Sequence, residues 1–161
     1  LTFLFCLTYF ALYWLFPVFF SQPRAKLSVN SLLSVISIVL LSLVIYIISF
    51  SLANEWLGNR VLHTFGGGFL AFLTCRLAAR DTKIQITKFQ LISISFLVST
   101  ALGVGNELLE FLFQSTTSLI FAPTIEDTWL DLASNTLGAL LAAALILPSL
   151  SLRSLRGNPV K

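Results

Sequence analysis

Two glutamates lie three residues apart in the stretch GVGNELLEFLFQ, within an otherwise strongly apolar part of the chain. Residues three or four positions apart lie on one face of a helix, so Glu107 and Glu110 would project in the same direction. Paired carboxyl groups can supply the general acid and the general base of a reaction. Because ionisable groups are costly to place inside apolar helices, their presence there indicates a functional site.

The histidine of this chain lies in a second apolar segment, GNRVLHTFGGGF. Asn59 and His63 are four residues apart and would share a helix face, with Arg60 beside them. An imidazole can donate or accept a proton, and it is also a common metal ligand. The guanidinium of Arg60 could contact a substrate or pair with a carboxylate of the fold, and both interpretations stay open.

A third segment, PTIEDTWLDLASNTLGALLAAA, repeats polar residues at helical spacing. Asp127, Asp131 and Asn135 follow one another at intervals of four residues, and the same stripe continues through Gly138 to Ala142. Small residues along a stripe allow another helix backbone to approach closely. We therefore predict that this stripe faces the interior of a helix bundle.

We predict that these three segments form one site. Its predicted catalytic residues are His63, Glu107, Glu110 and Asp131. Its predicted substrate-binding residues are Asn59, Arg60, Asp127 and Asn135. One imidazole with several carboxylates also suits a divalent cation such as Zn²⁺, Mn²⁺ or Mg²⁺, with His63, Glu107 and Asp131 as candidate ligands. No H-E-x-x-H motif occurs in the sequence, so a metal and its identity stay open.

Structural explanations stand beside these functional ones. Thr124 to Asp127 fits the S/T-x-x-D/E capping pattern, so Asp127 could cap a helix instead of binding a substrate. Arg60 could form an ion pair that holds the fold, and His63 could be a packed, hydrogen-bonded interior residue. In that case the polar cluster would simply hold three helices together.

The elements that position these residues are membrane-spanning helices. Of the 161 residues, 57% are hydrophobic and 11% are charged, whereas about a quarter of a soluble domain is charged. A spanning helix needs about 20 apolar residues, and five segments qualify. We predict one all-α domain over residues 1–161, a polytopic transmembrane bundle of about five spans. The predicted spans are 1–20, 31–53, 58–79, 89–114 and 125–147.

The basic residues predict the orientation of the bundle. Alternation of five spans places nine of the ten basic residues, and only one acid, on one side; these are Arg24, Lys26, Arg76, Arg80, Lys83, Lys88, Arg153, Arg156 and Lys161. Because lysine and arginine accumulate on the cytoplasmic side, the amino terminus is predicted outside and the carboxyl terminus in the cytoplasm. The site then lies at the extracytoplasmic end of the spans, in the cytoplasmic (inner or plasma) membrane.

These motifs bear a family resemblance. The segment Asn59 to His63, the glutamate pair, and the segment Asp131 to Gly138 resemble the motifs of VanZ-like membrane proteins. The Glu-x-x-Glu spacing is even more similar to YjdF-like inner-membrane proteins. The resemblance covers roughly residues 59–138 and implies a small multi-helix protein whose motif residues form its site. Glu110 replaces the glutamine of the VanZ pattern, which leaves a role in antibiotic resistance open.

Three functions fit these observations. The first is an enzyme acting at the outer membrane interface on the headgroup of an envelope lipid or cell-wall precursor. The second is a non-catalytic binding or scaffold protein. The third is a proton-coupled transporter, although transporter sites usually lie near the midplane of internally repeated folds. We expect the lipid bilayer as a partner and no nucleic acid. Whether the protein is an enzyme, its substrate and its oligomeric state stay open.

Overall fold

The computed structural model describes residues 2–21, 28–117 and 124–154, and it describes side chains from residue 7 to residue 147 within those ranges. Arg24, Lys26, Arg156 and Lys161, which contributed to the predicted orientation, lie outside the described residues. The elements are α1 (Thr2–Leu15), a 3₁₀-helix η1 (Phe16–Phe20), α2 (Val29–Ser51), α3 (Glu55–Val61), a π-helix η2 (Leu62–Phe69), α4 (Leu70–Asp81), α5 (Lys88–Thr116) and α6 (Ile125–Ser154).

The prediction of an all-α membrane bundle is confirmed. Four helices are long and apolar enough to cross a bilayer, namely Val29–Ser51, Glu55–Asp81, Lys88–Thr116 and Ile125–Leu147. The first predicted span appears as a shorter apolar helix, Leu7–Phe20. It tightens into η1 around Pro17, whose missing N–H cannot continue an α-helical hydrogen-bond pattern.

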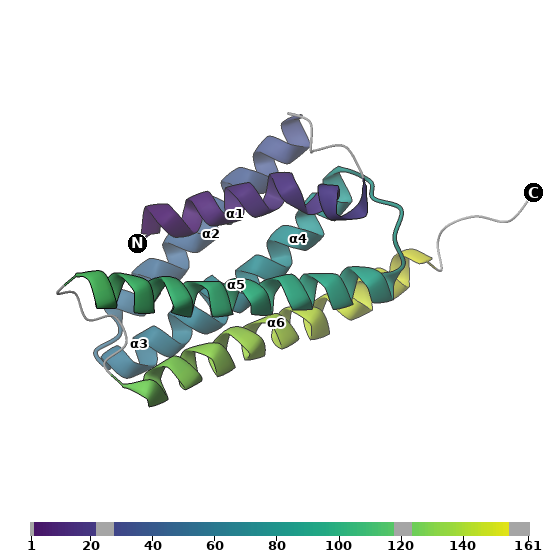
Figure 1. Cartoon of the computed structure of the whole chain (residues 1–161). Coiled ribbons are helices and arrows are strands. Elements are labelled where there is room, and N and C mark those ends of the chain that lie inside the picture. Colours follow the sequence, from purple (N-terminus) through teal and green to yellow (C-terminus); the bar gives the residue numbers. More distant parts are fainter. Residues whose placement is uncertain (1, 22–27, 118–123, 155–161) are drawn as a thin grey trace, which may run out of the picture.

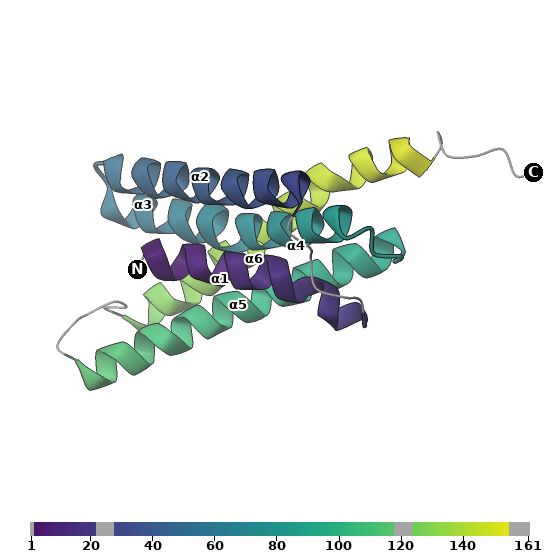
Figure 2. The same ribbon diagram turned by 90° about the horizontal axis from the view of Figure 1, so that it is seen from above.

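The chain runs back and forth between the two ends of the bundle (Figure 1). The helices α3, η2 and α4 join into one central rod, Glu55–Asp81, against which α1, α2, α5 and α6 all pack. Figure 2 shows α2 along one edge of the bundle and α5 running obliquely along the opposite edge. The starts of α1, α3 and α6 and the end of α5 therefore lie at one end, as the predicted alternation of spans requires.

The predicted small-residue stripe of α6 does face the bundle interior. A Cβ atom at Gly138 would overlap the carbonyl oxygen of Thr64 in η2, and one at Gly68 would overlap the carbonyl oxygen of Asn135. Ala139 and Ala142 are fully buried on the same stripe. No described glycine has a positive φ, so these two positions require glycine for space and not for backbone conformation.

The π-helix η2 was not predicted: residues 58–79 were predicted only as one membrane span. Its eight residues include Gly67 and Gly68, whose lack of side chains allows the wider turn to pack against α6, and Gly66, which faces Leu62 and, in α2, Ile45. The hydroxyl of Tyr9 in α1 donates a hydrogen bond to the carbonyl oxygen of Gly66. Such π-helical turns are rare and frequently occur at functional sites.

A polar network holds the other end of the bundle together. The carboxylate of Asp81 accepts hydrogen bonds from Tyr13 Oη at 2.7 Å and Ser34 Oγ at 2.5 Å. Arg80 Nε donates to its second oxygen at 2.7 Å. Since these residues belong to α1, α2 and α4, the buried Asp81 ties three helices at the end opposite to the glutamates.

Candidate functional site

His63 lies in the first turn of η2 with only 7% of its surface exposed. Its Nε2 atom is 3.2 Å from Asp131 Oδ1 of α6. Its Nδ1 atom is 3.2 Å from the side-chain amide Nδ2 of Asn135, one turn further along α6. Because an amide nitrogen can only donate, Nδ1 accepts in this arrangement, and Nε2 carries the proton that points to Asp131.

Asp131 is 1% exposed and fully surrounded by donors. The guanidinium of Arg60 reaches it with Nη1 at 3.0 Å. The Asn59 amide nitrogen lies 3.2 and 3.3 Å from its two carboxylate oxygens. Together with His63, these donors compensate the loss of hydration of a buried carboxylate.

Arg60 connects the two aspartates of α6. Its Nη2 pairs with Asp127 Oδ1, and its Nη1 donates to the backbone carbonyl of Asp127 at 3.2 Å. The backbone N–H of Asp127 also donates to Thr124 Oγ1 at 3.1 Å, as in the predicted helix cap. Thr124 is therefore the residue whose side chain caps α6, and the Asp127 side chain is the ion-pair partner of Arg60.

Glu107 contrasts sharply with Asp131. It is 7% exposed, and neither carboxylate oxygen has a hydrogen-bond donor among the described residues. The nearest charged or imidazole contact is His63 Nδ1, 3.9 Å from Glu107 Oε1. A buried carboxylate without a donor or a cation is strongly disfavoured, so Glu107 lacks the partner that its position requires.

One ligand atom each from His63, Glu107 and Asp131 lies within 4.8 Å of the other two. The three side chains come from η2, α5 and α6. Around a cation with bonds of about 2.0–2.2 Å, adjacent ligand atoms are about 3–4 Å apart. Small adjustments of the three side chains would therefore bring all three ligand atoms within bonding distance of one cation. One nitrogen and two carboxylate oxygens suit Zn²⁺ or Mn²⁺. We call these three residues the HED cluster.

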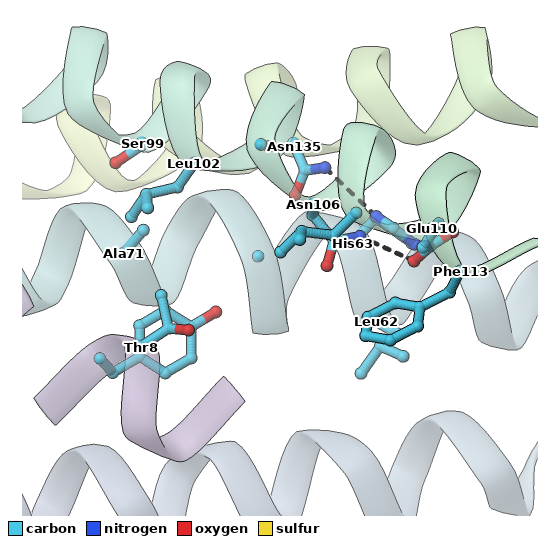
Figure 3. Close-up of a pocket in the computed structure, with 15 residues that line it drawn as sticks. Thr8, Leu62, His63, Ala71, Ser99, Leu102, Asn106, Glu110, Phe113 and Asn135 are labelled. Atoms are coloured by element: carbon cyan, nitrogen blue, oxygen red, sulfur yellow. Dashed lines mark hydrogen bonds between the residues drawn. The ribbon is translucent and has the colours of Figure 1, made fainter. Parts of the chain in front are cut away.

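Glu110 stands beside the HED cluster and faces a cavity. Its Oε1 accepts a hydrogen bond from Asn106 Nδ2 at 2.8 Å. Both residues line a cavity of about 340 Å³ together with His63 and Asn135. Figure 3 shows Glu110, Asn106 and His63 close together at one part of this space, with Thr8 and Ala71 at the other.

Asn106 was not among the predicted site residues. Its position four residues before Glu110 was the available signal, because asparagine and an acid at that spacing meet on a helix surface.

The chain was compared with known protein families, curated proteins and solved structures. It matches, over residues 2–151, a family described as "Predicted membrane protein (DUF2238)". The chain belongs to this DUF2238 family. No curated protein and no solved structure matches it.

This DUF2238 chain brings its predicted site residues together at one end of the bundle. Buried or half-buried side chains converge there from the central rod, α5 and α6; they are Asn59, Arg60, His63, Glu107, Glu110, Asp127, Asp131 and Asn135. Three of them form the HED cluster, Glu110 lies on the cavity wall, and Asp127 is linked to the cluster through Arg60. Their catalytic and substrate-binding roles stay predictions.

Proposed function

We propose that the protein is a membrane-embedded enzyme whose HED cluster binds one divalent cation at the extracytoplasmic end of the bundle. Its substrate is the headgroup of an envelope lipid or cell-wall precursor. The observation that carries the proposal is Glu107: its buried carboxylate has no donor among the residues that the structure describes, yet it lies 3.9 Å from an imidazole that also contacts a second carboxylate.

The charge around the cluster supports a cation. Four carboxylates gather at this end of the bundle, and one guanidinium accompanies them within the described residues; the acids are Glu107, Glu110, Asp127 and Asp131. Arg60 is already engaged by the two aspartates. With four carboxylates and one guanidinium the formal charge is −4 + 1 = −3, and a divalent cation would offset two of these three negative charges without another basic side chain.

The residues around the cluster then have distinct roles. A bound cation would supply Lewis-acid polarisation of a substrate oxygen. Arg60 and Asn59 hold the Asp131 carboxylate in position. Glu110 reaches the cavity, where a substrate group would lie, so it can exchange a proton with that group.

The resemblance to VanZ-like and YjdF-like proteins belongs to the same proposal. Its support is that the motifs Asn59 to His63, Glu107 to Glu110 and Asp131 to Gly138 supply the HED cluster and its hydrogen-bond partners. We propose on this basis a VanZ-like or YjdF-like type of envelope protein.

Metal analysis of the purified protein tests the proposal. We expect about one Zn²⁺ or Mn²⁺ per chain in the wild type. His63→Ala and Glu107→Gln should each bind the metal at least about tenfold more weakly. Mutating a residue that only hydrogen-bonds to a metal ligand already lowers metal affinity about 10–100-fold, and these variants remove a ligand itself. Glu126→Gln is the matched control, since Glu126 is an exposed acid at the same end of the bundle. Equal metal content in all four proteins, or none in the wild type, would exclude the proposal.

A scaffold function is the second candidate, and a specific observation favours it. Ion pairs and hydrogen bonds among Arg60, Asp131, Asn59 and His63 join the central rod to α6, as a purely structural network would. In a scaffold, Asp131→Asn would lower thermal stability in detergent, while Glu107→Gln would leave both stability and any envelope phenotype of a deletion strain unchanged. Loss of that phenotype in the stable Glu107→Gln variant would favour the enzyme.

A further inference from the structure

We propose that the cavity beside the HED cluster holds one hydrocarbon chain of a bilayer lipid, which reaches it sideways between α1 and α5. The polar group of that lipid lies next to Glu110 and His63. This inference rests on the proposed function, because it states how the lipid substrate of that site is held.

The walls of the cavity come from helices that leave a space between them. α1 packs against α2 and α4, but its described backbone does not contact that of α5. Thr8 and Tyr9 of α1 form one wall, and Leu102 and Leu109 of α5 form the opposite one. The space is partly open to its surroundings, and its lining is mostly apolar. Its volume of about 340 Å³ is within the range of ligand sites, roughly 300–1,000 Å³.

The cavity runs along the membrane-spanning direction. Its α5 lining extends from Ser99 to Phe113, which at 1.5 Å per residue corresponds to about 21 Å of a hydrocarbon core of about 30 Å. Ser99 and Ala71, at the deep end, are 1% and 2% exposed. Leu109 and Phe113, near the other end, are 46% and 45% exposed on a surface that faces acyl chains. A lipid chain is therefore available at the open side.

The cavity is apolar at its deep end and polar near the end of α5, as a lipid is apolar along its chain and polar at its headgroup. The deep part is lined by residues such as Ala71 and Leu102, whereas Asn106, Glu110 and His63 gather near the end of α5 (Figure 3). Because the bundle end coincides with the headgroup level of the bilayer, an amphiphile placed here would match apolar groups with the chain and polar groups with the headgroup.

Gly105 keeps this space open. It lies in the interior of α5 and lines the cavity, and a Cβ atom added there would meet no atom within 4 Å. Glycine destabilises a helix interior relative to alanine, and here no neighbouring atom requires its small size. The positions Gly68 and Gly138, by contrast, are filled by the backbone of a facing helix.

The test places progressively larger side chains at position 105, in the whole chain, so that they fill the cavity. Wild type, Gly105→Ala, Gly105→Leu and Gly105→Phe are purified in detergent, and binding of added dioleoyl phosphatidylethanolamine is measured by native mass spectrometry. We expect binding of one lipid by the wild type and a progressive loss, reaching about tenfold or more for Gly105→Leu, because its side chain excludes several methylene groups. The headgroup without chains, glycerophosphoethanolamine, should not compete.

Val104→Leu is the matched control, because Val104 is 43% exposed on the same helix and does not line the cavity. It should bind lipid within about twofold of the wild type. Leucine and alanine are better helix formers than glycine, so the Gly105 variants should fold, as a thermal unfolding scan would verify. Equal lipid binding by Gly105→Phe and the wild type, or competition by the chainless headgroup, would overturn the inference.

Metal content is measured on the same samples, which separates this inference from the proposed function. Lipid binding that responds to Gly105 in a protein without metal would support the cavity and reject the metal enzyme. If metal content falls in His63→Ala while the Gly105 variants bind lipid as the wild type does, the lipid cavity is rejected and the metal site is supported.

Discussion

At the scale of single residues, the site contains two buried carboxylates in opposite situations. Asp131 accepts hydrogen bonds from Asn59, forms an ion pair with Arg60 and contacts His63, whereas Glu107 has no donor among the described residues. Both are almost fully buried, so the difference lies in their partners and not in their exposure. Asp131 therefore stabilises the fold by itself, while Glu107 needs an added proton or cation.

This contrast predicts opposite effects on stability. In the presence of a chelator, Asp131→Asn should destabilise the protein by about 2–4 kcal/mol, because Arg60 and its neighbours lose a buried charged partner. Glu107→Gln should be neutral or stabilising by up to about 2 kcal/mol, because it removes an unpaired buried charge. Thermal unfolding in detergent measures both. A large destabilisation by Glu107→Gln without metal would mean that a partner for this carboxylate exists in the folded protein.

At the scale of elements, the contact between η2 and α6 determines where the HED cluster can form. Gly68 and Gly138 let the two backbones approach until each meets a carbonyl oxygen of the other helix. This approach brings His63 into contact with Asp131 and Asn135. A wider separation of the helices would pull the imidazole away from both.

Alanine substitutions should lower stability at the glycines of this contact and raise it at the glycine of the open cavity. Gly68→Ala and Gly138→Ala should each destabilise the protein by about 1–3 kcal/mol, because the added methyl group overlaps a backbone atom that cannot rotate away. Gly105→Ala should stabilise it by about 0.5–1 kcal/mol, because the methyl group enters free space on a helix. Thermal unfolding scans of the three variants show whether each substitution raises or lowers the stability of the protein. An increase in stability for Gly138→Ala would contradict the close contact.

The hydrogen bonds around Asp81 contribute to holding α1 against α2 and α4. Tyr13→Phe removes one hydrogen bond to a buried carboxylate and should cost about 1.5–3 kcal/mol. Tyr46→Phe is the control, since its ring packs against Phe50 at a partly exposed position. If both variants unfold at the same temperature, the hydroxyl of Tyr13 does not contribute to holding α1.

At the scale of the whole molecule, the described basic side chains other than Arg60 lie toward the end opposite to the site acids, whereas Arg60 pairs with two of those acids. Arg80, Lys83 and Lys88 surround the connection from α4 to α5, whereas Glu55 begins α3 at the other end. This arrangement agrees with the alternation on which the predicted orientation depends. Which end faces the cytoplasm stays a prediction from the distribution of basic residues.

Cysteine labelling in intact cells tests that orientation. A membrane-impermeant thiol reagent should modify Glu55→Cys and leave Lys83→Cys unmodified until the membrane is opened, because only the acidic end is predicted to lie outside. The chain has two cysteines, Cys6 and Cys75, so the protein without either substitution gives the background, to which the fully buried Cys75 should contribute little. Labelling of Lys83→Cys in intact cells would reverse the orientation and place the HED cluster on the cytoplasmic side.

Much of the site followed from the sequence because local periodicity carries that information. The four-residue spacing of Asp127, Asp131 and Asn135 placed them on one face of α6, and the small residues after them indicated a face turned inward. The lengths of the apolar segments brought His63 and Glu107 to the same level of the bilayer. Each of these inferences needs only the rise and rotation of a single helix.

The tertiary structure alone decided which partners each side chain has. The π-helix at Leu62–Phe69, the three donors around Asp131, the absence of a donor for Glu107 among the described residues, and the cavity beside Gly105 all depend on how separate helices rotate and approach. Side-chain contacts change over a few ångströms of helix separation, and periodicity within one helix contains no information about that distance. The sequence by itself therefore determined the composition and level of the site, and helix packing decided its chemistry.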